Sequence, residues 1–230
     1  MSEQKVAVDV VMPTWENDVM ANDAKQSIVA NTDFPIRIFK PVSNMLNKGW
    51  MAGCNEGIVD ALAKYDSEYI LLTNDDILVS PVVDWVSVMV GIMDQHKELG
   101  ALVPLTMNAM GYSRLTPENS LKSKFSFFRV PYASFCFVLL RKEAVRKVGM
   151  LDENLPGGDD LDYCLRLSNS GYIIGVTPKV FVWHHYAQTG KRIYGDYWDS
   201  PAHAEKITQA LIRKHGFMKF TCMMSGQEEN

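Results

Sequence analysis

The sequence has little of what marks membrane-spanning, secreted or polyanion-binding proteins. No apolar stretch reaches the roughly 18–20 residues that are needed to span a bilayer. The first residues, Met1-Ser2-Glu3-Gln4, lack the positive start and the apolar core of a signal peptide. A formal net charge of -4 gives no overall field that would attract nucleic acid or an anionic membrane. These absences favour a cytoplasmic protein without a membrane span.

Cysteine is also scarce. The four cysteines (Cys54, Cys136, Cys164 and Cys222) show neither the paired spacing of a metal site nor a disulfide-like pattern. Three of them sit among apolar neighbours and are expected to be buried thiols, which suits a reducing compartment. The remaining composition, 47% hydrophobic and 22% charged, is that of a globular protein, and 230 residues suffice for one substantial domain.

Predicted strands alternate with predicted helices along the chain. Apolar, β-rich runs predict strands at residues 6–12, 36–39, 69–73, 100–105, 132–140, 173–176 and 179–183. Helical composition predicts helices at residues 18–30, 51–64, 82–96 (with Pro81 at its start), 142–148, 157–170 and 201–215. A long polar segment at residues 107–129 interrupts the alternation. This order predicts an α/β fold with an open sheet and ligands at the carboxyl ends of its strands.

The tripeptide Asn74-Asp75-Asp76 stands at such a strand end. Two adjacent carboxylates there are costly to bury unless a cation meets them. In extended backbone Asn74 and Asp76 point the same way, and their oxygens suit magnesium or manganese shared with a phosphate. The alternative is a helix start signal, although Pro81 lies too far along the chain for a simple cap.

A second acidic cluster, Asp159-Asp160-Leu161-Asp162, follows Gly157-Gly158. A carboxylate at a helix N-terminus behind two glycines can accept a proton from an attacking hydroxyl. The alternative is a helix cap in which Asp162 and Arg166 form an ion pair one turn apart.

Two further segments have both a chemical and a structural interpretation. In His184-His185 the two imidazoles point to opposite faces of a strand, so at most one of them joins a single metal site. Gly49, Gly53 and Gly57 stand before or within the start of a helix. They either let backbone amides approach a phosphate or let the helix pack closely on its neighbour.

Together these segments resemble family 2 glycosyltransferases of the GT-A fold, from Val6 to Thr189. The matching motifs are short and stand in the family's order: Met12-Pro13-Thr14-Trp15; Asn47-x-Gly49 followed by Gly53-x-Asn55-x-Gly57-Ile58; Asn74-Asp75-Asp76; Val148-Gly149-Met150-Leu151-Asp152-Glu153; Asp159-Asp160-Leu161-Asp162-x-x-Leu165-Arg166 followed by Gly171-Tyr172; and Val182-Trp183-His184-His185. The resemblance implies a single domain with an open, mostly parallel sheet flanked by helices. It places that domain at residues 1–199, followed by a C-terminal helix and polar tail at residues 200–230.

The resemblance also implies a reaction and a site. A sugar would pass from a nucleotide-diphosphate donor to an acceptor hydroxyl, with inversion. Asp76 would bind Mn²⁺ or Mg²⁺, assisted by Asn74 or Asp75 and by His184. Asp160 would be the general base, with Asp159 or Asp162 orienting it or the acceptor. The residues expected beside the nucleotide are Pro13, Thr14, Trp15, Glu16, Asn47, Gly49, Asn55, Asn74 and Asp75.

The sequence departs from the family at two points. No acid follows the second strand where the family has Asp-x-x-Ser, and Asp159 stands where the family has Glu. Other interpretations are a nucleotidyltransferase that makes sugar nucleotides, a binder of nucleotide sugars or glycans without turnover, and transfer to a nucleic acid. Against the first, residues 13–18 are acidic where that class has a basic, glycine-rich loop. Against the last, the net charge gives no support.

Overall fold

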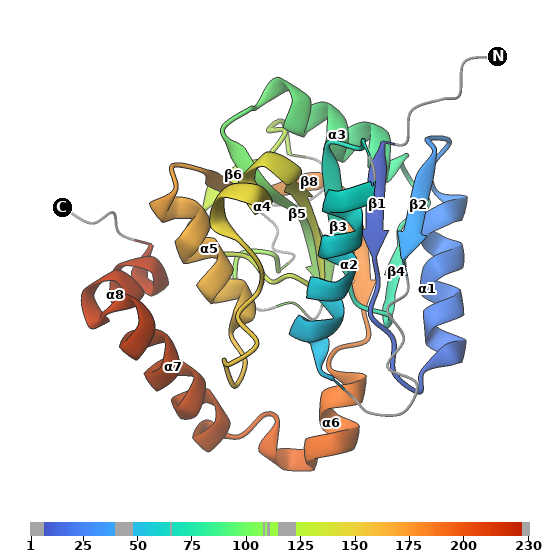
Figure 1. Ribbon diagram of the computed structural model, residues 1–230. Coiled ribbons are helices and arrows are strands. Elements are labelled where there is room, and N and C mark those ends of the chain that lie inside the picture. Colours follow the sequence, from blue (N-terminus) through green and yellow to red (C-terminus); the bar gives the residue numbers. More distant parts are fainter. Residues whose placement is uncertain are drawn as a thin grey trace.

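The protein is described by a computed structural model that covers residues 7–39, 48–64, 66–107, 109, 111–114 and 123–226. Its centre is an eight-stranded sheet with the strand order β2-β1-β3-β7-β5-β8-β4, and β6 pairs with β8 (Figure 1). The strands are β1 (Val8–Val11), β2 (Ile36–Phe39), β3 (Tyr69–Thr73), β4 (Ile77–Val79), β5 (Leu99–Met107), β6 (Phe128–Val130), β7 (Phe137–Arg141) and β8 (Ile173–His184). Among these, β1, β2, β3, β5 and β8 point one way, while β7, β4 and β6 run against their neighbours. The open, mostly parallel sheet is therefore confirmed.

Helices cover both faces of this sheet. They are α1 (Asp18–Ala30), α2 (Trp50–Lys64), α3 (Trp85–Gln95), α4 (Lys142–Val148), α5 (Asp159–Asn169), α6 (Gln188–Tyr194), α7 (Pro201–His215) and α8 (Phe217–Ser225), with a 3₁₀ turn η1 (Gly195–Tyr197) between α6 and α7. Helices α1 and α3 share one buried cluster with the sheet, and α2, α4 and α5 share another. No described helix has the length and apolarity that a bilayer crossing needs.

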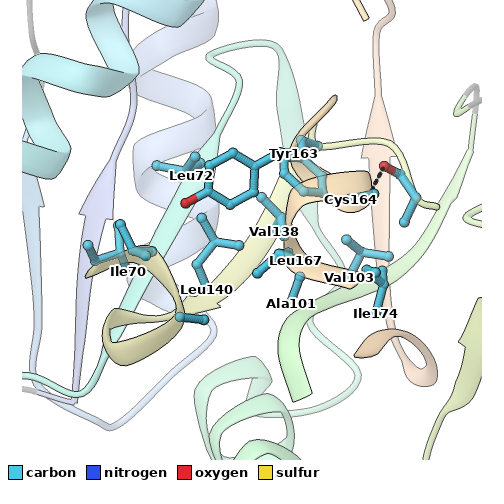
Figure 2. Packing of buried hydrophobic residues seen from close by; sticks show 14 of the residues in the cluster. Ile70, Leu72, Ala101, Val103, Val138, Leu140, Tyr163, Cys164, Leu167 and Ile174 are labelled. Carbon is cyan, nitrogen blue, oxygen red and sulfur yellow. Dashed lines mark hydrogen bonds between the residues drawn. The ribbon is translucent and has the colours of Figure 1, made fainter. Parts of the chain in front are cut away.

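Strand β3 shows how one apolar run serves both layers. Ile70 and Leu72 belong to the cluster on the α2–α5 side, whereas Tyr69 and Leu71 belong to the cluster on the α1–α3 side. Figure 2 shows Ile70 and Leu72 in the same packed layer as Tyr163 of α5. A strand that is buried on both faces has no polar face, which is why the sequence shows a continuous apolar run rather than alternation.

Several predicted boundaries need correction. The helix expected from residue 82 begins at Trp85, because the Asp84 carboxylate accepts a hydrogen bond from the Ser87 amide and caps it, while Pro81 lies in the preceding turn. Strand β4 was not predicted. The strand expected at residues 132–140 is β7 and begins only at Phe137. The loop expected at residues 107–129 ends in β6, and its residues 115–122 lie outside the described part of the chain.

The predictions near the C-terminus were also incomplete. Residues 173–176 and 179–183 form one strand, β8, because a register shift against β5 absorbs the irregularity between them. Helix α6 and η1 were not predicted. The expected polar tail contains α8, which buries Phe220 and Met223 in a cluster with Leu211 of α7. Figure 1 shows α6 below the carboxyl ends of β1 and β3, with α7 rising from the lower left toward α8.

Candidate functional site

A cleft of about 840 Å³ opens at the carboxyl ends of β1, β3 and β8. It is lined by residues from every segment that carried a predicted site. Those predicted residues are Pro13, Thr14, Trp15, Gly49, Asn74, Asp75, Asp76, Asp159, Asp160 and His184. The structure thus brings the two acidic clusters, 83 positions or more apart in the sequence, into one cavity.

At one end of the cleft, β8 delivers His184 to the turn after β3. Antiparallel pairing of β4 with β8 sets Ile77 opposite His184, so the turn at residues 74–76 lies beside the imidazole. His184 Nε2 is 3.0 Å from Asn74 Nδ2 and 3.2 Å from Asp76 Oδ1. The turn leads directly into β4 rather than into a helix, so the interpretation of these acids as a helix cap is wrong. The expected common direction of Asn74 and Asp76 is confirmed.

The adjacent histidines differ as predicted. The imidazole of His184 is buried and lines the cleft, whereas His185 is exposed and contacts the turn only through its backbone amide, which donates to the Asp76 carbonyl. Burial opposes protonation of His184, but hydrogen bonds to Asp76 and Cys136 outweigh it and raise the pKa of His184 to about 10. Burial, aided by the charge of Asp76, raises the pKa of Asp75 to about 6.

The donor set beside His184 fits a divalent ion that is completed by other ligands. Asp76 Oδ1 is buried 3.2 Å from His184 Nε2, and its lone pairs would also bind a cation between the two side chains. Asn74 offers an amide oxygen and His184 an imidazole nitrogen. Within the described part of the chain, no group of three or more His, Cys, Asp or Glu side chains is arranged to hold a metal. An ion here would therefore take its remaining ligands from water or from substrate phosphates, as Mg²⁺ commonly does.

The second acidic pair lies at the N-terminus of α5. Gly157 and Gly158 both have positive φ (143° and 72°), which gives the chain the sharp entry that places Asp159 and Asp160 in the cleft. Trp50 Nε1 donates a 3.0 Å hydrogen bond to Asp159 Oδ2. Burial first, and then the charge of Asp159, raises the pKa of Asp160 to about 7. Burial also raises the pKa of Asp159.

Asp162 is not among the residues that line the cleft. It is fully buried in the first turn of α5, where Oδ2 accepts from Arg166 and Oδ1 lies 2.7 Å from both Lys214 and His215 of α7. Burial alone would raise its pKa, but Lys214, Arg166 and His215 outweigh burial and hold the pKa of Asp162 below its usual value. The ion pair with Arg166 is confirmed, and Asp162 fastens α7 to α5.

Two residues expected beside the nucleotide lie elsewhere, and one cannot be placed. The Asn55 amide donates to the Leu151 carbonyl and to Glu153, and its oxygen accepts from the Leu151 amide, so it joins α2 to the segment before α5. Glu16 is exposed outside the cleft lining. Asn47 lies outside the described residues.

The helix glycines favour close packing. A Cβ on Gly57 would lie 2.3 Å from Val11 Cγ1, and one on Gly53 would lie 2.8 Å from Pro13 Cβ, so both let α2 approach the end of β1. Gly49 differs, because its φ of 84° requires glycine and it lines the cleft. Close packing of α2 is what sets Trp50 within reach of Asp159.

Arg192 of α6 binds the turn after β1 at Trp15 and Glu16, and we call this contact the clasp. The Arg192 guanidinium lies 4.7 Å from the centre of the Trp15 ring and donates to the carbonyls of Trp15 and Glu16, at 3.2 and 3.1 Å. Glu16, Tyr186 and Ala187 all have positive φ although none is glycine. Strained backbone of this kind persists where surrounding contacts over-determine it, often at functional sites.

Some cleft residues were missed by the sequence analysis. They are Trp50, the segment Ser134-Phe135-Cys136, and the aromatic residues Tyr194, Tyr197 and Trp198. The aromatic density of residues 194–198 was a signal in the sequence, but the helix that places these rings over the cleft was not predicted.

No family model and no curated protein matches the chain. Among solved structures, GalNAc-T7 crystallised with UDP, GalNAc and Mn²⁺ is similar with a TM-score of 0.61 and 16% identity, over 80% of this chain and 44% of that one. S. aureus TarS (residues 1–349) in complex with UDP-GlcNAc is similar with a TM-score of 0.59 and 13% identity, over 78% of this chain and 59% of that one. The same TarS fragment in complex with UDP gives a TM-score of 0.57 and 12% identity, over 96% of this chain and 75% of that one.

The chain therefore spans less than two thirds of the length of the first two of these structures. Similarity at these identities establishes the fold. The predicted GT-A fold is confirmed.

Proposed function

We propose that this protein is a metal-dependent glycosyltransferase that moves a sugar from a UDP-sugar donor to an acceptor hydroxyl, with inversion. The observation that carries the proposal is the shared cleft, in which the Asn74–Asp76 turn with His184 and the Asp159–Asp160 pair line one cavity. The fold adds support, because the similar solved structures include complexes with UDP, UDP-GlcNAc and Mn²⁺.

In this proposal Asp76, His184 and Asn74 hold Mn²⁺ or Mg²⁺ at the diphosphate end of the cleft. The ion supplies Lewis-acid stabilisation of the negative charge that builds on the departing nucleotide. Pro13, Thr14 and Trp15 flank the nucleotide at the end of β1, and the Arg192 clasp fixes the position of the Trp15 ring. Asp75 lines the same cleft and interacts with Asn17, so we assign it an assisting role rather than that of a ligand.

Asp160 is assigned as the general base. Its raised pKa of about 7 lies near the working pH, where a base is most effective. The acceptor oxygen attacks the anomeric carbon, its proton passes to Asp160, and the electrons of the broken carbon–oxygen bond leave with UDP. Asp159, oriented by Trp50, acts through its charge on Asp160. Inversion requires the base on the face of the sugar opposite the leaving group, so the metal turn and the acidic pair would flank the donor sugar.

The remaining assignments follow from this function. Residues 1–199 would form the catalytic domain, and residues 200–230 would form an extension that α7 fastens to α5. A cytoplasmic location stays a prediction. A nucleic acid acceptor is disfavoured, because the acids lining the cleft (Glu56, Asp75, Asp76, Asp159 and Asp160) outnumber the lysines (Lys48 and Lys206).

The test is calorimetric titration of UDP and of a panel of UDP-sugars, with and without Mn²⁺. Wild-type protein is expected to bind UDP only when Mn²⁺ is present. His184→Ala should lose that metal-dependent binding, while His185→Ala, which changes the exposed neighbour, should keep it. If both variants bind UDP equally well in the presence of Mn²⁺, His184 does not hold the metal ion. Binding without any release of UDP from a UDP-sugar would favour a binding protein over an enzyme.

A further inference from the structure

An aromatic wall lines the same cleft as the two acidic clusters. It consists of Tyr194 at the end of α6, Tyr197 in η1 and Trp198 directly after η1. The exposed fractions of Tyr194 and Tyr197 are 55% and 43%, which is high for large rings. Tyr194 and Trp198 are stacked, with ring centres 5.8 Å apart and planes inclined by 15°. Clustered exposed rings on a concave surface mark a binding site more often than chance exposure does.

The wall is held in place from behind. A Cβ on Gly190 would lie 2.7 Å from Trp198 Cδ2, so the glycine lets the indole lie directly on α6. His203 of α7 packs beside the wall, with ring centres 5.1 Å from Tyr197 and 5.3 Å from Trp198. The exposed ring faces are therefore presented by a supported surface, which lowers the entropy lost on binding.

Contacts through His203 and through Arg192 fix the position of the aromatic wall. On the base side, His203 Nδ1 lies 2.9 Å from the Trp198 carbonyl oxygen and His203 Nε2 lies 3.2 Å from that of Pro156, in the segment that leads to Asp159 and Asp160. On the other side, α6 is clasped to Trp15 through Arg192. The wall is therefore tied to the segment before Asp159 on one side and, through α6, to the turn after β1 on the other, and it lines the same cleft as Asp160.

The chemistry of this region selects its occupant. The acids that line the cleft repel phosphate-rich acceptors. Flat aromatic faces with a negative quadrupole attract the slightly positive C–H groups on the apolar face of a pyranose ring. Gln188, Thr189 and Lys206 line the same cleft and offer hydrogen bonds to hydroxyl groups. A neutral carbohydrate meets all three conditions, whereas a long aliphatic chain would leave these polar groups unused.

We infer that the aromatic wall is an acceptor subsite that stacks a pyranose ring of a neutral saccharide and presents one of its hydroxyl groups to Asp160. This inference rests on the proposed function and adds the chemical class of the acceptor. Tyr194 and Tyr197 provide the exposed stacking faces; Trp198 supports Tyr194, and His203 supports Tyr197. The subsite explains why an otherwise acidic cleft carries several large exposed rings at one end.

The test measures saccharide binding directly. Fluorescently labelled protein, saturated with UDP and Mn²⁺, is applied to a printed array of neutral oligosaccharides of glucose, galactose, mannose and their N-acetylated amino sugars. Wild-type protein is expected to bind a subset of them. Tyr194→Ala and Tyr197→Ala should each weaken that binding by about 2- to 10-fold, the usual effect of one aromatic contact, and the double variant by more. Phe217→Ala, which removes a ring that is 62% exposed on α8, is the matched control and should bind like wild type.

Calorimetry of UDP with Mn²⁺ separates this inference from the proposed function. The tyrosine variants should keep the wild-type affinity for UDP, which also shows that they are folded. If wild-type protein binds UDP but no saccharide, or if the double variant binds saccharides as tightly as wild type, the subsite is wrong while the donor site stands. If wild-type protein binds no nucleotide, the proposed function fails, whatever the array shows.

Discussion

Two groups of buried acids in this molecule have opposite surroundings. Toward the amino end of the sheet, Asp9 of β1 is fully buried and contacts Lys142 at 2.7 Å, Arg37 at 3.3 Å and the Ser67 hydroxyl. At the carboxyl end, Asp159 and Asp160 line the cleft, and within the described residues no lysine or arginine forms an ion pair with either. The partner of Asp159 is the neutral indole of Trp50.

Under the proposed function, this difference separates structural acids from functional ones. Asp9, like Asp162, is neutralised by cations that the chain itself supplies, so removing it leaves a buried positive charge. The cleft acids are kept together at a cost in stability, and only a bound cation or a proton in transfer would offset that cost. Functional sites commonly trade stability for activity in this way. Substitution of Asp9 should therefore lower the stability of the protein, whereas substitution of a cleft acid should lower its activity.

The largest expected effect is that of Asp160→Asn. The rate of UDP release from a UDP-sugar should fall by about 10²- to 10⁴-fold, the usual contribution of a general base. Affinity for UDP with Mn²⁺ should not change. Folding raises the pKa of Asp160 above its unfolded value, so at about pH 8, where both states are ionised, the wild type carries the full cost of this charge. The variant should therefore be at least as stable as wild type at that pH. Near-normal turnover would move the base to another residue.

Asp9→Asn should show the reverse pattern. Removing one partner of a buried pair strands Lys142, and we expect the free energy of unfolding in urea to fall by about 3–5 kcal/mol. The protein that remains folded should bind UDP with wild-type affinity, because Asp9 lies outside the cleft lining. Lost UDP affinity in a variant of normal stability would contradict the division into structural and functional acids.

The pH dependence of turnover tests the coupling within the cleft pair. If Asp160 is the general base that we propose, its ionised form is active, so kcat/KM should rise about tenfold per pH unit below its pKa of about 7 and level off above it. Asp159→Asn removes a like charge that disfavours ionisation of Asp160, so the midpoint should move to lower pH. A midpoint that stays in place, or moves upward, would show that Asp159 does not set the pKa of the base.

A smaller effect is expected at the clasp. Arg192→Ala removes the stacking on Trp15 and two hydrogen bonds from the end of β1, and we expect UDP with Mn²⁺ to bind about threefold more weakly, in line with one exposed cation–π contact. Arg213→Ala, an exposed arginine of α7, is the control and should have no effect. An unchanged affinity in Arg192→Ala would leave the clasp a purely structural contact.

Much of the fold was readable because local signals agreed with the tertiary structure. The helices at residues 18–30 and 142–148 and the strand at residues 69–73 begin and end where composition changes. The predictions failed where pairing with distant segments decided the outcome. Strand β4 has only three residues and exists because β8 pairs with it, and β8 continues through an irregularity because β5 and β6 hold it on both sides.

The same distinction applies to the site. The positions of Asp76, Asp160 and His184 in the cleft were predictable because polar groups at strand and helix ends need a chemical reason. Asp162 also stands near a helix N-terminus, but its partners Lys214 and His215 come from a helix about 50 positions later. No local sequence pattern predicts such a contact. Trp50 and the aromatic wall were missed because their role depends on how α2 and α6 approach the sheet.

The most direct test of the account is the position of a metal ion in a crystal soaked with UDP and Mn²⁺. We expect an anomalous scattering peak at the manganese edge within bonding distance of Asp76 and His184, with UDP along the end of β1 and Asp160 facing the same cavity. A peak at another site, or ordered UDP without any manganese at the Asp76 turn, would contradict it.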